Sequence, residues 1–447
     1  FFQAEDGIRD PTKGLVTFEY EPNDFTLGQE VIYGGGMRIK KITTDPIQGE
    51  QISKQYRYFG PNSTQNTYQS YGKIVSFPQF ARRVANQGAH EGYKNVEIYS
   101  HNQAPYVTKG SYVGYAQVDE FNSLAGQADG LVRSYFDVSG MHGEETYTPP
   151  FYEPLDGFPL YQELHRYYSA YGFNGMILKE NELFPFAPNP NFDWYRGSLL
   201  KKEVYKDDAD ADDLVSSTIY SYKVKNTGVA KVGALKIVKE NTNINFILSS
   251  KYYSNNEFNL YLEVAPYYYI SAWKHLSAEN ETRYDANGQN PVTTLKYYKY
   301  DSETHKRMTS NSFKDSDGKT KGTDYTYPKD IVNTGTDDYS QAIGLMKQLN
   351  YNSPVIEKTS WVMNGSLKLI LDGQLNLHKK YTVEDDQGIL QNFVALSDVY
   401  HLEISPYLFA SSFDYVSVNN QTLSFDNKFR KKIEILHRNK RGGITSL

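Results

Sequence analysis

The chain consists largely of short segments in which aromatic or aliphatic residues alternate with polar ones. This pattern runs through residues 37–42, 107–118, 130–138 and 259–264. It is typical of half-buried β-strands, because successive side chains of a strand point to opposite faces. No stretch shows the long strand-helix alternation of a parallel α/β sheet. We therefore expect an all-β, mainly antiparallel fold, either a β-sandwich or open twisted sheets.

One pattern recurs along the chain and predicts repeated β-hairpins. An arm that ends in an aromatic residue is followed by a second arm that ends in Tyr-x-Tyr, and the two ends are 14 to 17 residues apart. The first arms are residues 202–205, 281–284 and 311–313, and the second arms end at Tyr220/Tyr222, Tyr298/Tyr300 and Tyr325/Tyr327. A similar pair of arms covers residues 38–45 and 56–58, and a less complete first arm covers residues 358–361. Because the copies are unevenly spaced, no fixed-period solenoid is expected.

A few segments predict other local structure. One or two short helices are expected, at residues 159–172 and from Asp338 to Leu349, where apolar residues share one helical face and Asp337 or Asp338 can cap the start. The triple glycine 34–36 indicates a bulge or bend entering a strand, because no Lys-Ser/Thr follows it as in a phosphate-binding loop. The pairs Asn287-Gly288, Asn364-Gly365 and Asp372-Gly373 predict turns.

These elements divide the chain into four expected parts. Residues 1–14 form a non-native or disordered lead, since the first ten resemble a translated sequencing adapter. Residues 15–192 form a β-rich domain that ends in a connector with three prolines. The hairpin repeats occupy residues 193–330, and residues 331–447 form a second β-rich region with one helix.

Composition excludes several classes of function. The 447 residues contain no Cys, which excludes disulfides and thiolate chemistry. A net charge of −6 gives no electrostatic support for binding nucleic acid. The sequence contains no apolar run of the roughly 20 residues that a transmembrane helix needs. The most unusual feature is the tyrosine content, 40 residues against only 3 Trp.

No residue pattern indicates a catalytic, cofactor or metal site. The nine His residues are scattered singly. The acidic run 207–213 lacks the glycine and the bidentate glutamate of a calcium loop. A carboxylate pair suited to glycoside hydrolysis has no sequence spacing rule, so that alternative stays open.

The tyrosine pairs can be interpreted in two ways. Because the two tyrosines of a pair are two positions apart on a strand, both rings lie on the same face of the sheet. If that face is covered, the rings belong to the core. If it is bare, Tyr220, Tyr222, Tyr298, Tyr300, Tyr325 and Tyr327 can form a stacking platform for a glycan.

Several motifs together resemble a known family. The run Arg283-Tyr-Asp-Ala-Asn-Gly-Gln289 is similar to the Tyr-Asp-x-x-Gly core of YD repeats in Rhs-type proteins, and is the one complete copy here. Residues 33–40, 111–115, 193–197 and 354–357 resemble segments of large surface or secreted proteins of the Bacteroidota that carry such repeats.

The resemblance implies a non-enzymatic scaffold, shell or display segment of a longer exported polypeptide. That protein would be secreted or held at the outer surface of a Gram-negative bacterium. The rest of the same polypeptide would be the main partner. Two other functions stay open, a module that binds cell-surface glycans and a β-fold polysaccharide hydrolase.

Overall fold

The structure is a computed structural model. It describes residues 8–10, 14–27, 30–46, 48–60, 69–74, 81–85, 94–98, 113–138, 194–206, 214–239, 262–285, 288–332, 335–384, 390–435, 437–438 and 444–446. The chain forms two compact units, which are described separately. Unit 1 comprises Phe1–His275 and Arg283–Pro291, and unit 2 comprises Leu276–Thr282 and Val292–Leu447.

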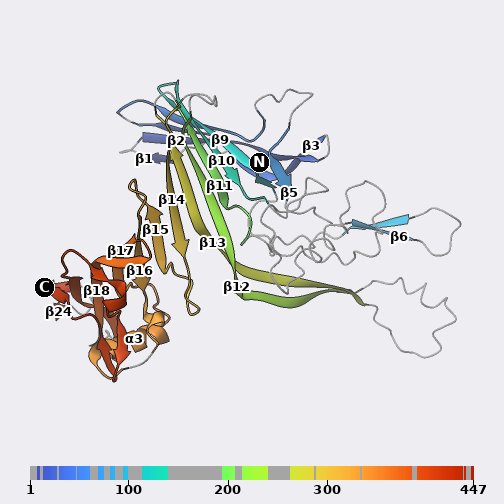
Figure 1. The fold of residues 1–447 in the computed structure, drawn as a ribbon. Coiled ribbons are helices and arrows are strands. Elements are labelled where there is room, and N and C mark those ends of the chain that lie inside the picture. The colour runs from blue at the N-terminus through green and yellow to red at the C-terminus, as the bar shows by residue number, and fades with distance from the viewer. Residues whose placement is uncertain are drawn as a thin grey trace, which may run out of the picture. The chain divides into compact units, whose positions relative to one another are not determined.

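Unit 1 is a ladder of antiparallel strands in which neighbours along the chain mostly pair with each other (Figure 1). In order of pairing, its strands are β1 (Ile8–Asp10), β2 (Gly14–Leu27), β3 (Glu30–Asp45), β4 (Ile52–Arg57), β9 (Gln117–Leu124), β10 (Gln127–Phe136), β11 (Leu199–Tyr205) and β12 (Leu214–Lys239). The next strand, β13 (Leu262–Arg283), contributes residues to both units. Two separate pairs are β5 (Gly72–Ile74) with β8 (Val113–Tyr115) and β6 (Ala81–Ala85) with β7 (Lys94–Ile98).

Unit 2 is also built on a ladder of antiparallel strands. Its paired strands are β14 (Val292–Lys299), β15 (Ser310–Lys314), β16 (Thr320–Thr326), β17 (Glu357–Asn364), β18 (Leu367–Glu384), β19 (Leu390–Leu402) and β23 (Phe429–Glu434). The shorter elements are η2 (Pro328–Asp330), α3 (Asp338–Gln348), β20 (Leu408–Phe409), η3 (Ala410–Ser412), β21 (Ser417–Asn419), β22 (Thr422–Ser424), β24 (His437–Arg438) and β25 (Ile444–Ser446). Strand β20 pairs with β18, β21 with β22, and β24 with β25.

The helix α3 confirms the expectation for residues 338–349. The Asp337 carboxylate accepts hydrogen bonds from the amides of Tyr339 and Ser340, as an N-cap residue does. The helix buries Ile343 and Met346 in the core of unit 2 and lies against β18 (Figure 1). The apolar stripe therefore forms a helix because it has a sheet to cover.

The cores of the two units differ in kind. Unit 2 has an apolar core of fourteen buried residues, which includes Trp361, Ile370 and Leu375. The apolar cluster described in unit 1 is small, with Phe25 and Val113 buried at its centre. Much of the described interior of unit 1 is instead polar, and includes Asp24, Arg38, Asp119 and Glu203 among its buried side chains.

The expected hairpins form. The arms around residues 41–55, 201–219 and 310–324 pair antiparallel as β3 with β4, β11 with β12, and β15 with β16. In the copy whose arms lie between residues 281 and 300, the hydroxyls of Thr282 and Thr293 lie 3.1 Å apart across the two arms. The all-β, mainly antiparallel prediction is confirmed.

Two of the hairpin loops have the same hydrogen-bonded turn. In the first, the amide of Gly288 donates to the Asp285 carbonyl at 3.0 Å, and the amide of Gln289 donates to the Asp285 carboxylate at 2.8 Å. In the second, the amides of Gly318 and Lys319 make the same bonds to Asp315 at 3.0 and 2.8 Å. Both glycines have positive φ, 70° and 76°. Asp315-x-x-Gly318 is thus a second copy of the Asp-x-x-Gly turn that the sequence analysis did not recognise.

One expected turn is wrong. Asp372 and Gly373 lie inside β18, paired with Ser360 and Thr359 of β17. A Cβ on Gly373 would lie 3.2 Å from side-chain atoms of Leu402 and Phe429, so this glycine allows close packing rather than a turn. The turn at Asn364-Gly365 is confirmed, because Asn364 pairs with Leu367 across it.

Other expectations are not tested by the described residues. The helix expected at 159–172 and the acidic run 207–213 lie outside them. Three residues of the expected lead form β1, which pairs with β2. The four-part division of the chain stays a prediction.

Candidate functional site

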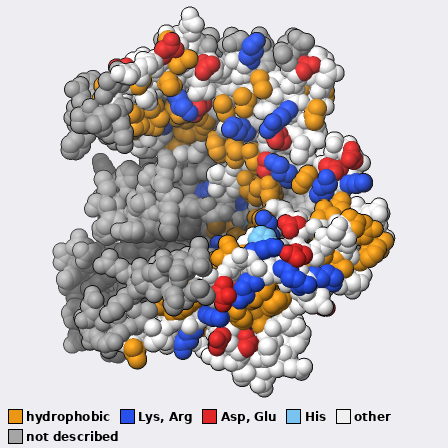
Figure 2. Space-filling view, turned by 90° about the vertical axis from the view of Figure 1, so that its left-hand side faces the viewer, with side chains coloured by type: hydrophobic (Ala, Val, Ile, Leu, Met, Phe, Trp, Pro, Cys, Tyr) orange, Lys and Arg blue, Asp and Glu red, His pale blue; other side chains and the backbone are white. Residues whose placement is uncertain are grey.

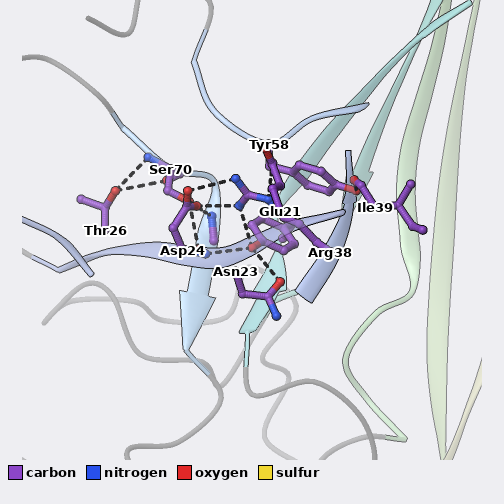
Figure 3. Close-up of polar contacts among 10 residues, drawn as sticks. Glu21, Asn23, Asp24, Thr26, Arg38, Ile39, Tyr58 and Ser70 are labelled. Carbon is purple, nitrogen blue, oxygen red and sulfur yellow. Dashed lines mark hydrogen bonds and ion pairs between the residues drawn. The ribbon is translucent and has the colours of Figure 1, made fainter. Parts of the chain in front are cut away.

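A buried arginine cluster lies where β2, β3, β4, β8 and the residues before β5 meet (Figure 3). The Arg38 guanidinium donates to both carboxylate oxygens of Asp24, at 2.6 and 2.9 Å, and to Glu21 at 2.6 Å. It also donates to the Tyr115 hydroxyl at 2.7 Å. The side chains of Arg38 and Asp24 are only 7% and 5% exposed. A bidentate, buried pair of this kind is among the strongest polar contacts in proteins.

Two tyrosine rings flank the same guanidinium. Its carbon lies 4.5 Å from the ring centre of Tyr58 and 5.0 Å from that of Tyr115, within the range of cation–π attraction. Burial lowers the pKa of Arg38, but its hydrogen bonds to Asp24, Tyr115 and Glu21 outweigh that effect and leave the pKa above its ordinary value. Arg38 is therefore a fixed positive charge at every physiological pH.

The Asp24 carboxylate has a second buried partner. Ser70 donates to it at 2.5 Å, and the amide of Gly72 donates to the Ser70 hydroxyl at 2.9 Å. The Tyr58 hydroxyl donates to the carbonyl of Ile39 at 2.7 Å. These contacts join segments that are far apart in the sequence, and they leave the charged groups of the cluster bonded to one another.

The triple glycine 34–36 forms a bulge beside this cluster, as expected. Tyr33 pairs with Asp24 and Met37 with Pro22, so three residues of β3 lie opposite Asn23 alone. Gly36 has φ +87°, and a Cβ on Gly34 would lie 2.5 Å from a Val113 methyl group. Glycine is required there for backbone shape and close packing, and the bulge sets the register in which Arg38 pairs with Glu21.

A second polar network crosses unit 1 as a row of alternating charge. Arg57 of β4 pairs with Asp119 of β9, Asp119 with Arg133 of β10, and Arg133 with Glu203 of β11. Asp119 is fully buried and accepts from Arg57 at 2.8 Å and from Arg133 at 2.9 Å. A slip of one residue would turn these side chains to the opposite face of the sheet, so the row favours a single register.

The electrostatics of the row follow from these contacts. Burial raises the pKa of Asp119, but hydrogen bonds from Arg133, Arg57 and Gln117 outweigh it, and the pKa lies below its ordinary value. For Glu203, burial is likewise outweighed by hydrogen bonds from Lys201, Tyr205 and Tyr135, which lower its pKa. Both carboxylates are therefore held in the charged form.

A third polar contact joins Lys274 of β13 to Asp137, just after β10, and to Tyr195, just before β11. The Lys274 ammonium donates to Asp137 at 2.6 Å and to the Tyr195 carbonyl at 2.7 Å. It also lies 4.2 Å from the ring centre of Tyr195 and 5.1 Å from that of Tyr222. The backbone of Asp137 hydrogen-bonds to Gly197 and Ser198 at 2.8 Å each. These bonds hold the two strand ends together.

The contacts within these networks favour a role in positioning the strands. Each carboxylate described above already accepts hydrogen bonds from a cation or a hydroxyl, and the Arg38, Arg57, Arg133 and Lys274 charges are directed at those carboxylates. Within the described ranges, no group of three or more His, Cys, Asp and Glu side chains is arranged to hold a metal ion. The helices described include none that is long and apolar enough to cross a bilayer.

The six tyrosines proposed for glycan stacking are covered to different extents. Tyr327 is buried, and the other five are half-buried. Three hydroxyls donate to neighbouring backbone or side chains: Tyr222 to the Leu199 carbonyl at 2.9 Å, Tyr298 to Glu279 at 2.9 Å, and Tyr327 to the Met308 carbonyl at 3.0 Å. The Tyr325 hydroxyl accepts from Asn311 at 3.3 Å. A glycan platform on these residues stays a prediction.

Among the described residues that Figure 2 colours by type, no large region of a single charge is visible. Lys and Arg side chains are interspersed with Asp and Glu, with hydrophobic side chains between them. Sequence reasoning missed the inward-facing charges of Arg38 and Asp119. Alternation gave no signal for them, because it shows on which face of a strand a charged side chain lies but not whether that face is covered and the charge needs a buried partner.

Comparison with known proteins gives little further information. No protein-family model matches the chain, and no curated protein matches it. Two solved structures align with 88% of this chain at 9% sequence identity. One is a crystal structure of TcdB2-TccC3 without its hypervariable C-terminal region, with a TM-score of 0.35, and the other is the Tc holotoxin pore of Photorhabdus luminescens, with a TM-score of 0.36. This chain spans 17% of the length of each of those chains, and scores this low assign neither family nor function.

Proposed function

We propose that this chain is a non-catalytic structural segment, a scaffold, shell or surface display element, of a larger exported protein of the YD-repeat type. The observation that carries the proposal is the repeated turn. Asp285-x-x-Gly288 and Asp315-x-x-Gly318 make the same hydrogen bonds at the ends of neighbouring hairpins. A turn that recurs with the same geometry in a ladder of paired strands serves to extend a sheet.

The buried charges of unit 1 support the same proposal. Arg38, Asp119 and Lys274 each contact partners on other strands or segments, and these contacts select one register among the strands. Buried ion pairs contribute little net stability compared with an apolar core, but they disfavour every alternative pairing, because each would leave a charge buried without a partner. In a long ladder of many similar strands, such charges would keep each strand paired with its correct neighbour.

The proposed setting follows from the resemblance of the motifs. The main partner would be the remainder of the same polypeptide, and the protein would be secreted or held at the outer surface of a Gram-negative bacterium. The absence of Cys, and hence of any need for disulfides, is compatible with that setting.

The test combines binding, hydrolysis and stability measurements on the purified chain. We expect no retention on a glycan array and no release of sugars from a panel of polysaccharides. Tyr298→Ala should lower the free energy of unfolding by about 1–2 kcal/mol, because it removes a half-buried ring and a hydrogen bond to Glu279. The matched variant Tyr297→Ala, on the adjacent position where the ring is 46% exposed, should have a smaller effect.

Two results would contradict the proposal. Glycan binding that is lost in the Tyr298→Ala, Tyr300→Ala double variant while the chain remains folded would establish a binding module. Release of sugar from any polysaccharide, in proportion to the purified protein, would establish a hydrolase.

A further inference from the structure

Glu357 is a buried carboxyl group at the start of β17 in unit 2, paired with Thr326 of β16 and Leu375 of β18. It is 1% exposed. Its Oε2 accepts one hydrogen bond, at 3.2 Å, from the amide of Val416. Its Oε1 accepts none from any described residue. A buried carboxylate with so few donors is energetically unfavourable, whereas the neutral carboxylic acid is tolerated far better.

The amide partner of Glu357 belongs to a segment that covers the sheet. We call residues 413–426 the covering segment; its residues Phe413, Val416, Val418 and Leu423 are buried in the same core as Ile356 and Leu375. It is also tied near α3, since the Leu423 amide donates to Asp337 at 2.9 Å and the Gln421 carbonyl accepts from Thr336 at 2.7 Å. Glu357 therefore lies between the sheet and its cover.

The charged and titratable groups that face Glu357 come from the covering segment. Asp426 is 1% exposed, and its carboxylate accepts from the amides of Asp414 and Lys428 at 3.2 and 2.9 Å. Lys428 also reaches Asp426, at 3.4 Å. The Tyr415 phenol lies close enough to interact with Glu357 and with Asp324 of β16. No described cation forms an ion pair with Glu357, so its ionisation would place a second negative charge near Asp426.

We propose that Glu357 is a proton-controlled latch: as a neutral acid it holds the covering segment on the sheet, and as a carboxylate it loosens that segment. The ionised form lacks donors for Oε1 and repels Asp426. Both effects are relieved if the covering segment moves away and admits water. This inference concerns the local stability of unit 2 and does not depend on the proposed function.

The pH range follows from the direction of the pKa change. Burial and, to a smaller extent, the Asp426 charge raise the pKa of Glu357, whereas the Val416 hydrogen bond lowers it, and the net pKa is about 7. The folded state therefore binds the proton more tightly than the unfolded state, whose ordinary value is 4.5. The contribution of the latch is complete below pH 4.5 and is lost as the pH rises through about 7.

Hydrogen exchange of the full chain tests the latch directly. After division by the intrinsic exchange rates, the amides of Val416 and Leu423 should exchange on the order of 100-fold faster at pH 8 than at pH 5. Glu357→Gln, which has nearly the shape of the neutral acid, should abolish this dependence. Asp426→Asn should move the midpoint to lower pH, because it removes the neighbouring charge.

The control is Glu403→Gln. Glu403 is an exposed carboxyl of unit 2 paired with Lys432 at 2.5 Å, so its loss should leave the pH response of the covering segment unchanged. Equal normalised exchange at pH 5 and pH 8 in the natural chain would overturn the proposal. The proposal would also be overturned if the normalised exchange rate rose from pH 5 to pH 8 by the same factor in Glu357→Gln as in the natural chain. If Glu357→Gln fails to fold, Glu357→Leu removes the same titration and is judged by the same criterion.

Discussion

At the scale of single residues, Arg38 is the centre of the buried polar cluster described in unit 1. Its guanidinium bonds to Asp24, Glu21 and Tyr115, and the Asp24 carboxylate beside it is almost fully buried. The network as a whole need not exceed an apolar core in stability. Removing one member, however, leaves a buried charge without compensation, which is far more unfavourable than the loss of the contact itself.

Arg38→Met should therefore lower the free energy of unfolding of unit 1 by about 3–5 kcal/mol. The matched variant is Lys54→Met, which breaks the ion pair of Lys54 with Glu120, where the lysine side chain is 46% exposed. An exposed pair of this type is worth about 0.2–1 kcal/mol. Urea denaturation of both variants measures the difference. Equal losses would show that the buried cluster has no special energetic role.

At the scale of elements, the Asp-x-x-Gly turns and the helix α3 place glycine in two different backbone states. Gly318 has φ +76° in its turn, and no atom lies close enough to obstruct a Cβ there. Gly344 lies inside α3, and no atom would lie within 4 Å of a Cβ added there, whereas at Gly318 only a Lys314 side-chain carbon, at 3.7 Å, would be in ordinary contact. The same substitution should therefore have opposite effects at the two sites, for reasons of backbone conformation alone.

Gly318→Ala should destabilise unit 2 by about 1 kcal/mol, because alanine is strained at positive φ. Gly344→Ala should stabilise it by about 0.5–1 kcal/mol, because alanine has the higher helix propensity. Thermal unfolding of the two variants provides the comparison. A stabilising Gly318→Ala would mean that the turn does not have the conformation described here.

At the scale of the whole molecule, each unit has its own pH response. The pKa of Asp119 in unit 1 lies below its ordinary value, because its arginine partners outweigh burial. For such a group the stabilising contribution is present above the unfolded pKa and is lost as the pH falls through the folded one. Glu357 in unit 2 has the opposite sign, since its contribution is lost as the pH rises.

We expect hydrogen-exchange protection of residues 117–135 to fall as the pH drops below 3.8, the ordinary pKa of an aspartate, because the opened state then binds a proton that the folded state binds more weakly. Asp119→Asn should be less protected than the natural chain at pH 7, and should lose less on acidification. The ratio of the protection factors of the two proteins at each pH separates the contribution of Asp119 from that of other acid-labile groups. A ratio that is constant from pH 7 to pH 3 would contradict the assigned role of Asp119.

Local pattern was sufficient for much of this architecture. Alternating residues specified strands, Asp337 specified the start of α3, and the triple glycine specified a bulge. These features could be predicted because each depends on backbone preferences within a few residues. The turn at Asp315 was missed because Lys314 precedes the aspartate where Tyr284 precedes Asp285, although the Asp-x-x-Gly spacing is the same in both.

The candidate site and the latch could not be predicted in this way. Alternation places Arg38 and Asp119 on one face of a strand, but it does not say which strand lies beside them or what covers that face. Arg38 meets Tyr115 across 77 positions of the chain, and Glu357 meets Val416 across 59. Such contacts depend on strand order and register, which are set by the packing of the whole unit. Sequence alone therefore determined the strands, the helix and the bulge, and the folded arrangement determined which charges are paired and which carboxyl group is left with a single donor.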